Sequence, residues 1–258
     1  MRLYLKFVAM HLQSQMQYKI SFFLLALGQF LVSFTALLGV SFMFTRFNAV
    51  DGFRFPEVLL CLATVLMAFS LAELFGRGFD HFPRIIRSGE LDRMLVRPRP
   101  LVPQVLASLI EFSRLGRLVQ AILVFCYAIP ASGIHWTWDK ALTLCLMVLC
   151  GSIVFFSLFL IYAAFSFFTI EGLEFMNVFT DGGREFGRYP YSIYGREVLR
   201  FFTYVIPLAL FQYYPLLYLL GRRTSILYML MPLLALPFAI PAYAFWRYGL
   251  SKYNSTGS

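Results

Sequence analysis

The chain has 258 residues, of which 60% are hydrophobic, 19% are aromatic and 14% are charged. Its mean hydropathy of +0.72 and its apolar runs of about 20 residues exclude an ordinary soluble domain and predict an integral membrane protein. The net charge is +9, but the basic residues gather at the ends of the apolar runs. In that position they set orientation in a membrane, so a nucleic-acid partner is not expected. The spans should be helices, because a backbone in hydrocarbon must satisfy its own hydrogen bonds.

The first predicted elements are an amphipathic helix and two spans. Residues 1–19 are too polar to cross a bilayer, and Leu3, Phe7 and Met10 share one helical face. This pattern predicts an interfacial helix, with a solvated extension as the alternative. Two apolar spans follow, over about residues 20–44 and 58–75.

A polar loop over residues 76–100 separates the second span from the third. It carries six arginines and three acids, and clustered arginines resist translocation, so the loop is expected in the cytoplasm. Ser88 is predicted to cap a short helix, which Pro98 and Pro100 end. The apolar side of this helix, which would suit a docking surface for a soluble partner, comprises Leu91, Met94 and Leu95. The alternative interpretation is a topology anchor alone.

The third span is predicted over about residues 101–129. Glu111, Arg114 and Arg117 lie three residues apart near its start and therefore share a helical face. Because the purely apolar part of the run begins only after them, we expect these charges at the cytoplasmic boundary. A helix that began with the run would place them within the membrane, where they would be a functional candidate. The most apolar span follows, over about residues 141–168.

Residues 169–200 allow two interpretations. Hydropathy alone makes this polar stretch a second cytoplasmic loop, with the apolar run 201–220 as the fifth span. However, Pro207 and Pro215 divide that run into short pieces, and a broken apolar segment beside a polar one is typical of a re-entrant hairpin. Both interpretations end with a last span over about residues 226–246.

The distribution of basic residues predicts the orientation of the chain. Three lie in the N-terminal segment, six in the loop after the second span and two in the C-terminal tail. The loops after the first and third spans carry only Arg46, Arg54 and Lys140. Both termini are therefore expected in the cytoplasm, with an even number of crossings.

The sequence contains no motif of familiar catalytic chemistry. It has no G-x-x-x-x-G-K-[ST], no H-E-x-x-H and no G-x-S-x-G. Its four cysteines lie in apolar runs without metal-ligand spacing, so neither a catalytic nor a metal site is predicted. An enzyme would have to use Glu171, Glu174 and Asp181, which share a helical face. Such residues more often form a buried polar network or line an aqueous path.

Three features together resemble a known family. The amphipathic N-terminal segment is followed, after the second span, by the run SGELDRMLVRPRP, and NVFTDGGREFGRYPYSIYG precedes RFFTYVIPLALFQYYPLLYLLGR. In this combination the chain resembles the type 2 ABC exporter permeases, and among them the small six-span permeases whose ATPase is a separate chain. The resemblance covers nearly the whole chain.

The resemblance implies partners and a coupling site. Two permeases, identical or paralogous, would bind two ABC ATPase subunits in the bilayer. The ATPases would hold ATP and Mg, and no cofactor is implied for this chain. In the family, the loop after the second span contains a coupling helix that docks on the ATPase. Carried over to this sequence, that site comprises Arg87, Ser88, Gly89, Glu90, Leu91, Asp92, Arg93, Met94 and Leu95.

The family also implies the fold and its location. The expected fold is an all-α integral membrane protein in the bacterial inner membrane, with six transmembrane helices and an N-terminal interfacial helix. Residues 169–187 would form a polar fifth span, and residues 199–220, with Pro207 and Pro215, an outer re-entrant hairpin.

The polar face of that fifth span is the second candidate site. Glu171, Glu174, Asn177 and Asp181 stay on one side of a helix at 100° per residue. A charged side chain facing lipid costs ~2.5–3.5 kcal/mol, so we expect this face at the dimer interface or the transport path. Arg184 is a candidate partner, and a salt-bridge network that only joins two helices is the alternative.

The expected function is export of an amphipathic, lipid-like or drug-like substrate by alternating access, driven by the partner ATPases. Two alternatives stay open. One is an integral-membrane enzyme that uses the face of Glu171, Glu174 and Asp181, and the other is a channel or scaffold subunit without an ATPase.

Overall fold

The computed structural model of the chain describes residues 2–169 and 174–255. These residues are mainly helical, and the only β pairing among them is one bridge between Val50 and Phe53. Five of the described helices are long and apolar enough to cross a membrane, and one bent helix pair raises the number to six. The predicted all-α integral membrane fold is confirmed.

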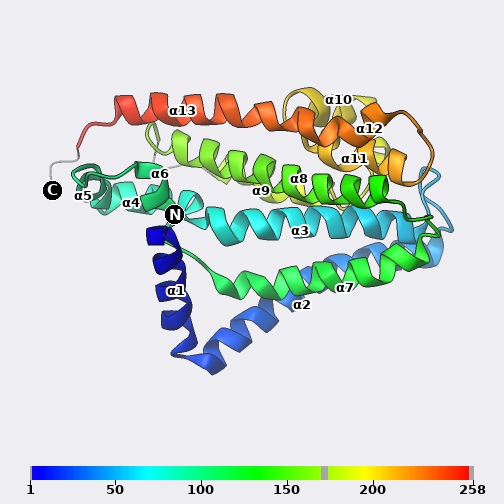
Figure 1. Ribbon diagram of the computed structural model, residues 1–258, viewed down its shortest axis with the longest axis horizontal. Helices are drawn as coiled ribbons and strands as arrows, with labels where there is room; N and C mark the ends of the chain where they lie inside the picture. Colours follow the sequence, from blue (N-terminus) through cyan, green and yellow to red (C-terminus); the bar gives the residue numbers. More distant parts are fainter. Residues whose placement is uncertain (1, 170–173, 256–258) are drawn as a thin grey trace.

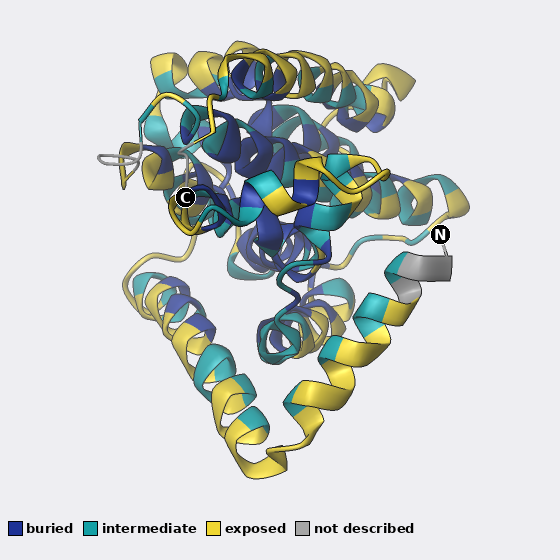
Figure 2. Cartoon of the chain, turned by 90° about the vertical axis from the view of Figure 1, so that its left-hand side faces the viewer, coloured by how far each residue is buried: buried dark blue, intermediate teal, exposed yellow. Residues whose placement is uncertain are grey.

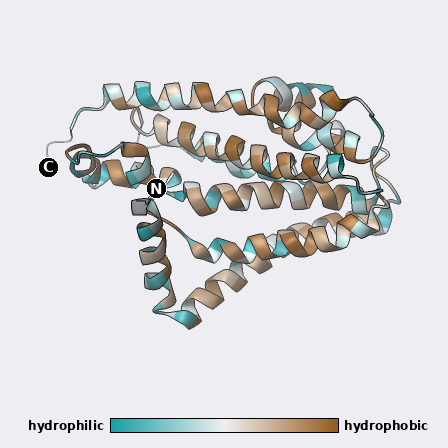
Figure 3. Ribbon diagram, viewed as in Figure 1, coloured by the Kyte–Doolittle hydropathy of each residue, from teal (hydrophilic) through white to brown (hydrophobic). Residues whose placement is uncertain are grey.

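The long helices lie side by side along the long axis of the molecule (Figure 1). They are α2 (Lys19–Arg46), α3 (Phe55–Asp80), α7 (Leu115–Ala131), α8 (Trp138–Phe165) and the run from α12 (Ile226–Leu230) through η3 (Met231–Phe238) to α13 (Ala239–Lys252). Their surfaces are largely apolar, whereas the hydrophilic residues concentrate towards the two ends (Figure 3). Both termini lie at one end, together with the short helices α4 to α6.

Helix α3 is the centre of the bundle and α2 is at its edge. In the most apolar window of each helix, 83% of the residues are buried in α3 and 17% in α2. Figure 2 shows α1 (Arg2–Met16) and the start of α2 mostly exposed, outside the buried core. The apolar surface of α2 is therefore available to lipid or to another membrane chain.

Two close helix contacts depend on glycine. A Cβ at Gly116 of α7 would lie 1.9 Å from the backbone oxygen of Ala26 in α2, and a Cβ at Gly78 of α3 would lie 2.0 Å from that of Val105. No side chain fits at these distances. Small residues at helix crossings let backbones approach closely in membrane proteins, so these two glycines set how near α2 and α6 come to the bundle.

The third predicted span begins later than expected. The run 101–129 is divided into α6 (Leu101–Leu106), a break, the short η1 (Phe112–Arg114) and then α7, and the candidate span covers Phe112–Ala131. The charged residues that follow the break explain why the membrane helix does not begin at Leu101, because burying them in lipid is costly.

Helix α1 packs across this break and satisfies its free backbone groups. The Nε2 atom of His11 lies 2.9 Å from the carbonyl oxygen of Ala107. One helical turn later, the Gln15 amide donates to the carbonyl of Ile110 at 2.5 Å and accepts from the N–H of Phe112 at 3.1 Å. Backbone groups freed by a helix break need such partners when they are buried. The N-terminal helix is thus fixed to the start of α7.

An aromatic cluster joins the ends of three long helices beside the short helices α4 and α5. Trp246 of α13, which is 1% exposed, has ring-centroid distances of 5.1 Å to Phe79, 4.6 Å to Phe82 and 5.2 Å to Phe167. Aromatic pairs at these separations add to the free energy gained from burial alone. The cluster therefore connects the polar loop after α3 to α8 and α13.

The polar stretch forms one short helix beside α3 and α8. Helix α9 (Glu174–Phe186) has 13 residues, which is about 20 Å at 1.5 Å per residue, and the hydrocarbon core is ~30 Å thick. Within the described residues, it covers 174–186 of the polar span predicted over 169–187. Glu171 lies outside the described residues.

The apolar run after α9 is bent, as its prolines predicted. Helix α10 (Arg196–Tyr204) and helix α11 (Leu208–Leu219) meet at 112°. Pro207 stands at the N-cap of α11, and Pro215 lies inside that helix. Proline has no N–H to donate, which explains a break at this point. In Figure 1 the pair lies at the end of the molecule opposite the two termini.

Candidate functional site

The loop after α3 is largely helical and built on the core. Helix α4 (Phe82–Arg87) almost continues α3, and α5 (Glu90–Leu95) follows after a turn. The N-cap of α5 is Gly89, with φ of 67°, a conformation that glycine adopts without strain. Ser88 was predicted to cap this helix, but its hydroxyl donates to the carbonyl of Ile85 at 3.2 Å. That prediction was wrong.

The apolar side of α5 is divided between the core and the surface. Leu91 is 0% exposed and Met94 is 5% exposed, both within the main hydrophobic cluster. Neither side chain is free to contact a partner, contrary to the sequence-based prediction. Leu95 is 44% exposed and the following Val96 is 86% exposed. The residues that sequence periodicity grouped on one side of the helix therefore divide into a buried pair, Leu91 and Met94, and the exposed Leu95. The exposed Val96 was not among the residues predicted for docking.

Besides this burial, hydrogen bonds donated by three residues fix α5 and the chain just after it to the body of the protein. The hydroxyl groups of Tyr253 and Ser255 donate to the two carboxylate oxygens of Asp92, at 3.2 and 2.8 Å. The Gln104 amide donates to the carbonyls of Met94 and Arg99, each at 3.1 Å. A force applied to α5 would therefore reach the C-terminal tail and the start of α6.

The outer side of this segment is basic with an apolar centre. Its exposed residues include Arg87, Arg93, Leu95, Val96 and Arg97, and we call this set the α5 surface. The acids of the same segment, Glu90 and Asp92, are only partly exposed. Exposed aliphatic groups ringed by guanidinium groups suit a complementary groove with an acidic rim.

A buried charged network lies between α2, α3 and α7. Glu73 of α3 has a side chain only 4% exposed, and its carboxylate is 2.5 Å from the Arg117 guanidinium. The guanidinium groups of Arg77 and Arg114 lie 3.5 Å from the same carboxylate. The Gln29 side-chain oxygen accepts from Arg114 at 3.1 Å and from Arg117 at 2.6 Å. The charged donors replace the water that would otherwise solvate this buried carboxylate, and they stabilise its ionised form.

The sequence indicated only part of this network. Glu111, Arg114 and Arg117 were placed on one face at the membrane boundary, and Glu111 does pair with Arg114 at 2.9 Å. Arg117 instead points into the protein and is 5% exposed. Its partner Glu73 lies 44 residues earlier in the chain. An acid inside an apolar span is itself a signal that a partner is needed.

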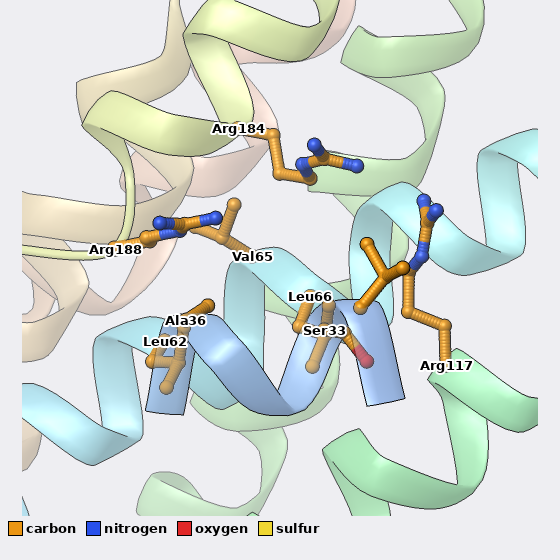
Figure 4. Close-up of a pocket in the computed structure, with 9 residues that line it drawn as sticks. Ser33, Ala36, Leu62, Val65, Leu66, Arg117, Arg184 and Arg188 are labelled. Carbon is orange, nitrogen blue, oxygen red and sulfur yellow. The ribbon is translucent and has the colours of Figure 1, made fainter. Parts of the chain in front are cut away.

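A small cleft opens beside this network, between α2, α3, α7 and α9 (Figure 4). It is lined by aliphatic residues and Ser33, and by three arginines, Arg117, Arg184 and Arg188. Arg184 extends from α9, Arg188 from the turn that follows this helix, and Arg117 from α7. The Arg184 guanidinium lies 4.8 Å from the Phe69 ring, and that of Arg117 lies 5.9 Å from the same ring. Phe69 thus brings the two arginines together.

The predicted polar face of α9 lies beside Arg184 on the same helix. Glu174, Asn177 and Asp181 are exposed in the single chain. Asp181 pairs with Arg184 at 3.3 Å, and Arg184 also reaches Glu185 at 3.0 Å. The predicted pairing of Arg184 with this polar face is therefore observed for Asp181. Among the described residues no group of three metal-binding side chains occurs.

A family model described as "ABC-2 family transporter protein" matches residues 30–257 of the chain. The chain belongs to this family. The resemblance to type 2 ABC permeases noted in the sequence is confirmed. No curated protein and no solved structure gives a significant match.

Membership makes this chain the permease component of an ABC transporter and a multi-pass membrane protein. ABC-2 permeases work with ABC ATPases in general. The charged cleft lies between helices of the bundle, whereas the polar face of α9 is exposed in the single chain.

Proposed function

We propose that this permease is the membrane subunit of an exporter that works by alternating access. Two permeases, identical or paralogous, would bind two ATPase subunits that hold ATP and Mg. The observation that carries this proposal is the α5 surface: exposed Leu95 and Val96 among arginines, on a helix anchored in the core. Apolar side chains exposed in this way cost free energy in water, and the α5 surface suits a groove on a soluble partner.

The anchoring of α5 gives a physical route for coupling. When ATP closes the two ATPases, each would displace an α5 surface. Leu91 and Met94 transmit the displacement because they pack within the main core, and Asp92 carries it to the C-terminal tail. The cluster around Trp246 then connects it to α3, α8 and α13. Packed cores shift between discrete arrangements rather than deforming continuously.

The orientation of the chain in the membrane follows from the α5 surface. A docked ATPase places α5 in the cytoplasm, and both termini lie at that end of the molecule (Figure 1). The α10–α11 pair, bent by 112°, then lies at the outer end as a re-entrant hairpin. We place the protein in the bacterial inner membrane, where an exporter of this kind operates.

The polar face of α9 would be covered in the assembled transporter. Glu174, Asn177 and Asp181 are exposed in the single chain, and charged groups do not face lipid at membrane depth without cost. A second permease against this face, or a transport path along it, would remove that cost. The substrate would be an amphipathic molecule, lipid-like or drug-like.

Co-purification tests the proposed assembly. The tagged permease should retain a soluble ABC ATPase when both are expressed together and extracted in mild detergent. Adding ATP and Mg to the purified complex should then give hydrolysis that the permease alone lacks. An isolated permease that never retains an ATPase would instead favour a channel or scaffold subunit.

Cysteine labelling from outside intact cells tests the orientation. Glu197 of α10 has an 85% exposed side chain, so Glu197→Cys should react with a membrane-impermeant thiol reagent in intact cells. Arg99→Cys should react only after the cells are opened. Both are made in a chain whose exposed Cys126 and Cys145 are replaced by alanine. The opposite pattern at the two positions would reverse the proposed orientation.

A further inference from the structure

The cleft between α2, α3, α7 and α9 has the chemistry of an anion site. Nine residues line it, including three arginines and no acid. The carboxylates that pair with these arginines approach from outside the lining: Glu73 on Arg117, and Asp181 and Glu185 on Arg184. The nitrogen atoms that point into the cleft are therefore all cationic donors (Figure 4).

One of the arginines that line the cleft has a buried donor without a partner in the part of the chain that the structure describes. The side chain of Arg117 is 7% exposed, and its Nε atom has no hydrogen-bond partner among the described residues. Leaving a buried charged donor unsatisfied costs free energy, so an acceptor is expected there. Guanidinium groups match the two oxygens of a carboxylate or phosphate particularly well.

Apart from Ser33, the remaining walls of the cleft are aliphatic. They comprise Val32, Ala36, Leu62, Val65 and Leu66. The enclosed volume of about 30 Å³ holds roughly two water-sized groups, enough for the oxygens of one acidic head but not for a chain. Val32 at the mouth is 62% exposed, and its helix α2 continues as an apolar, exposed surface. A tail would therefore leave the cleft along α2.

We propose that this cleft binds the oxyanion head of an amphiphile, a carboxylate or phosphate, whose apolar tail lies along α2. The inference rests on the proposed function and narrows its substrate class from amphipathic to acidic amphipathic. Arg184 of α9 and Arg188 of the turn after α9 bind the head from one side, and Arg117 of α7 binds it from the other. Since α9 and α2 are both at the edge of the bundle, the ligand would lie where a second permease approaches.

Two arginines can be removed without stranding a buried acid. The side chains of Asp181 and Glu185, which pair with Arg184, are 56% and 40% exposed, and Glu185 is also the partner of Arg188. The double variant Arg184→Gln/Arg188→Gln should therefore fold. Arg196→Gln/Arg200→Gln is the matched control, because it removes two exposed arginines at the same spacing on α10. Arg117 is unsuitable, since its loss removes the nearest cationic donor of the buried Glu73.

Binding is measured with spin-labelled stearic acid and with its methyl ester. The permease is purified and placed in nanodiscs of phosphatidylcholine, at an alkaline pH where the carboxyl is ionised and arginine stays charged. Paramagnetic resonance then reports the immobilised fraction of each probe. The acid should be immobilised far more than the ester. The Arg184→Gln/Arg188→Gln variant should weaken binding of the acid on the order of tenfold or more, and the control variant should not.

Three results would overturn the proposal. They are equal immobilisation of acid and ester, equal binding by the wild type and the Arg184→Gln/Arg188→Gln variant, and displacement of the probe by inorganic phosphate at equal concentration, which would assign the cleft to a free anion. Retention of the ATPase is measured on the same samples. If the probe binds as expected but no ATPase is retained, the proposed transporter assembly fails while the anion site stands.

Discussion

Replacing Arg117 with methionine is expected to destabilise the permease by about 3–5 kcal/mol, the usual cost of removing one member of a buried ion pair. Glu73 has a side chain only 4% exposed and would lose a donor at 2.5 Å. The guanidinium groups of Arg77 and Arg114, at 3.5 Å from its carboxylate, compensate only in part. Thermal unfolding of the detergent-solubilised protein measures the loss.

Two further variants separate charge from packing. Glu73→Gln/Arg117→Gln removes both charges and should recover most of the stability, because no uncompensated ion stays buried. Arg200→Met removes an exposed arginine whose pair with Glu197 is also exposed, and should change stability by less than ~1 kcal/mol. If Arg117→Met unfolds at the wild-type temperature, or the double variant is no more stable than Arg117→Met, the network does not hold these helices together.

An aspartate at position 96 is expected to abolish coupling without unfolding the protein. Val96 is 86% exposed, so the folded permease tolerates a charge there. An apolar contact at the centre of an interface contributes ~1–2 kcal/mol or more when lost, and a buried aspartate without a partner adds a further cost. Val96→Asp should reduce ATPase binding at least tenfold and stop transport, measured with the purified complex in vesicles.

The neighbouring variant Leu91→Asp should behave differently. Leu91 is 0% exposed and packs in the main core, so a carboxylate there lowers the unfolding temperature and reduces the yield of folded protein. Leu91 is thus a poor test of docking, although sequence periodicity selected it. A Val96→Asp protein that couples normally, or a Leu91→Asp protein with wild-type stability, would contradict the division of α5 into a buried and a docking side.

The sequence predicted the helices better than the contacts they make. Periodicity shows that Leu91, Met94 and Leu95 share a side of a helix, but not whether that side meets the protein's own core or a partner. The deciding information is the main hydrophobic core, whose members extend to Trp246, more than 150 residues further along the chain. Likewise Glu73 and Arg117 meet because two long helices cross, and no local pattern records that.

The breaks were predictable where proline causes them. Pro207 and Pro215 indicated that the run 199–220 is not one straight helix, and the pair α10–α11 is bent by 112°. The break before α7 has a different cause. His11 and Gln15 of α1 satisfy the backbone there, and these contacts join residues almost 100 positions apart. Such a break is stable only in the folded protein. The charges at Glu111, Arg114 and Arg117 indicated that the membrane helix starts late, but not where the chain breaks.

The central claim is that an ATPase docks on the α5 surface, and site-specific photo-crosslinking tests it most directly. A photoreactive residue in place of Arg97 should crosslink to the ATPase in the assembled complex. The same residue in place of Tyr204, which is 84% exposed, should not, because its helix α10 lies away from α5, towards the other end of the molecule (Figure 1). Crosslinks to the ATPase from position 204, with none from position 97, would contradict the account.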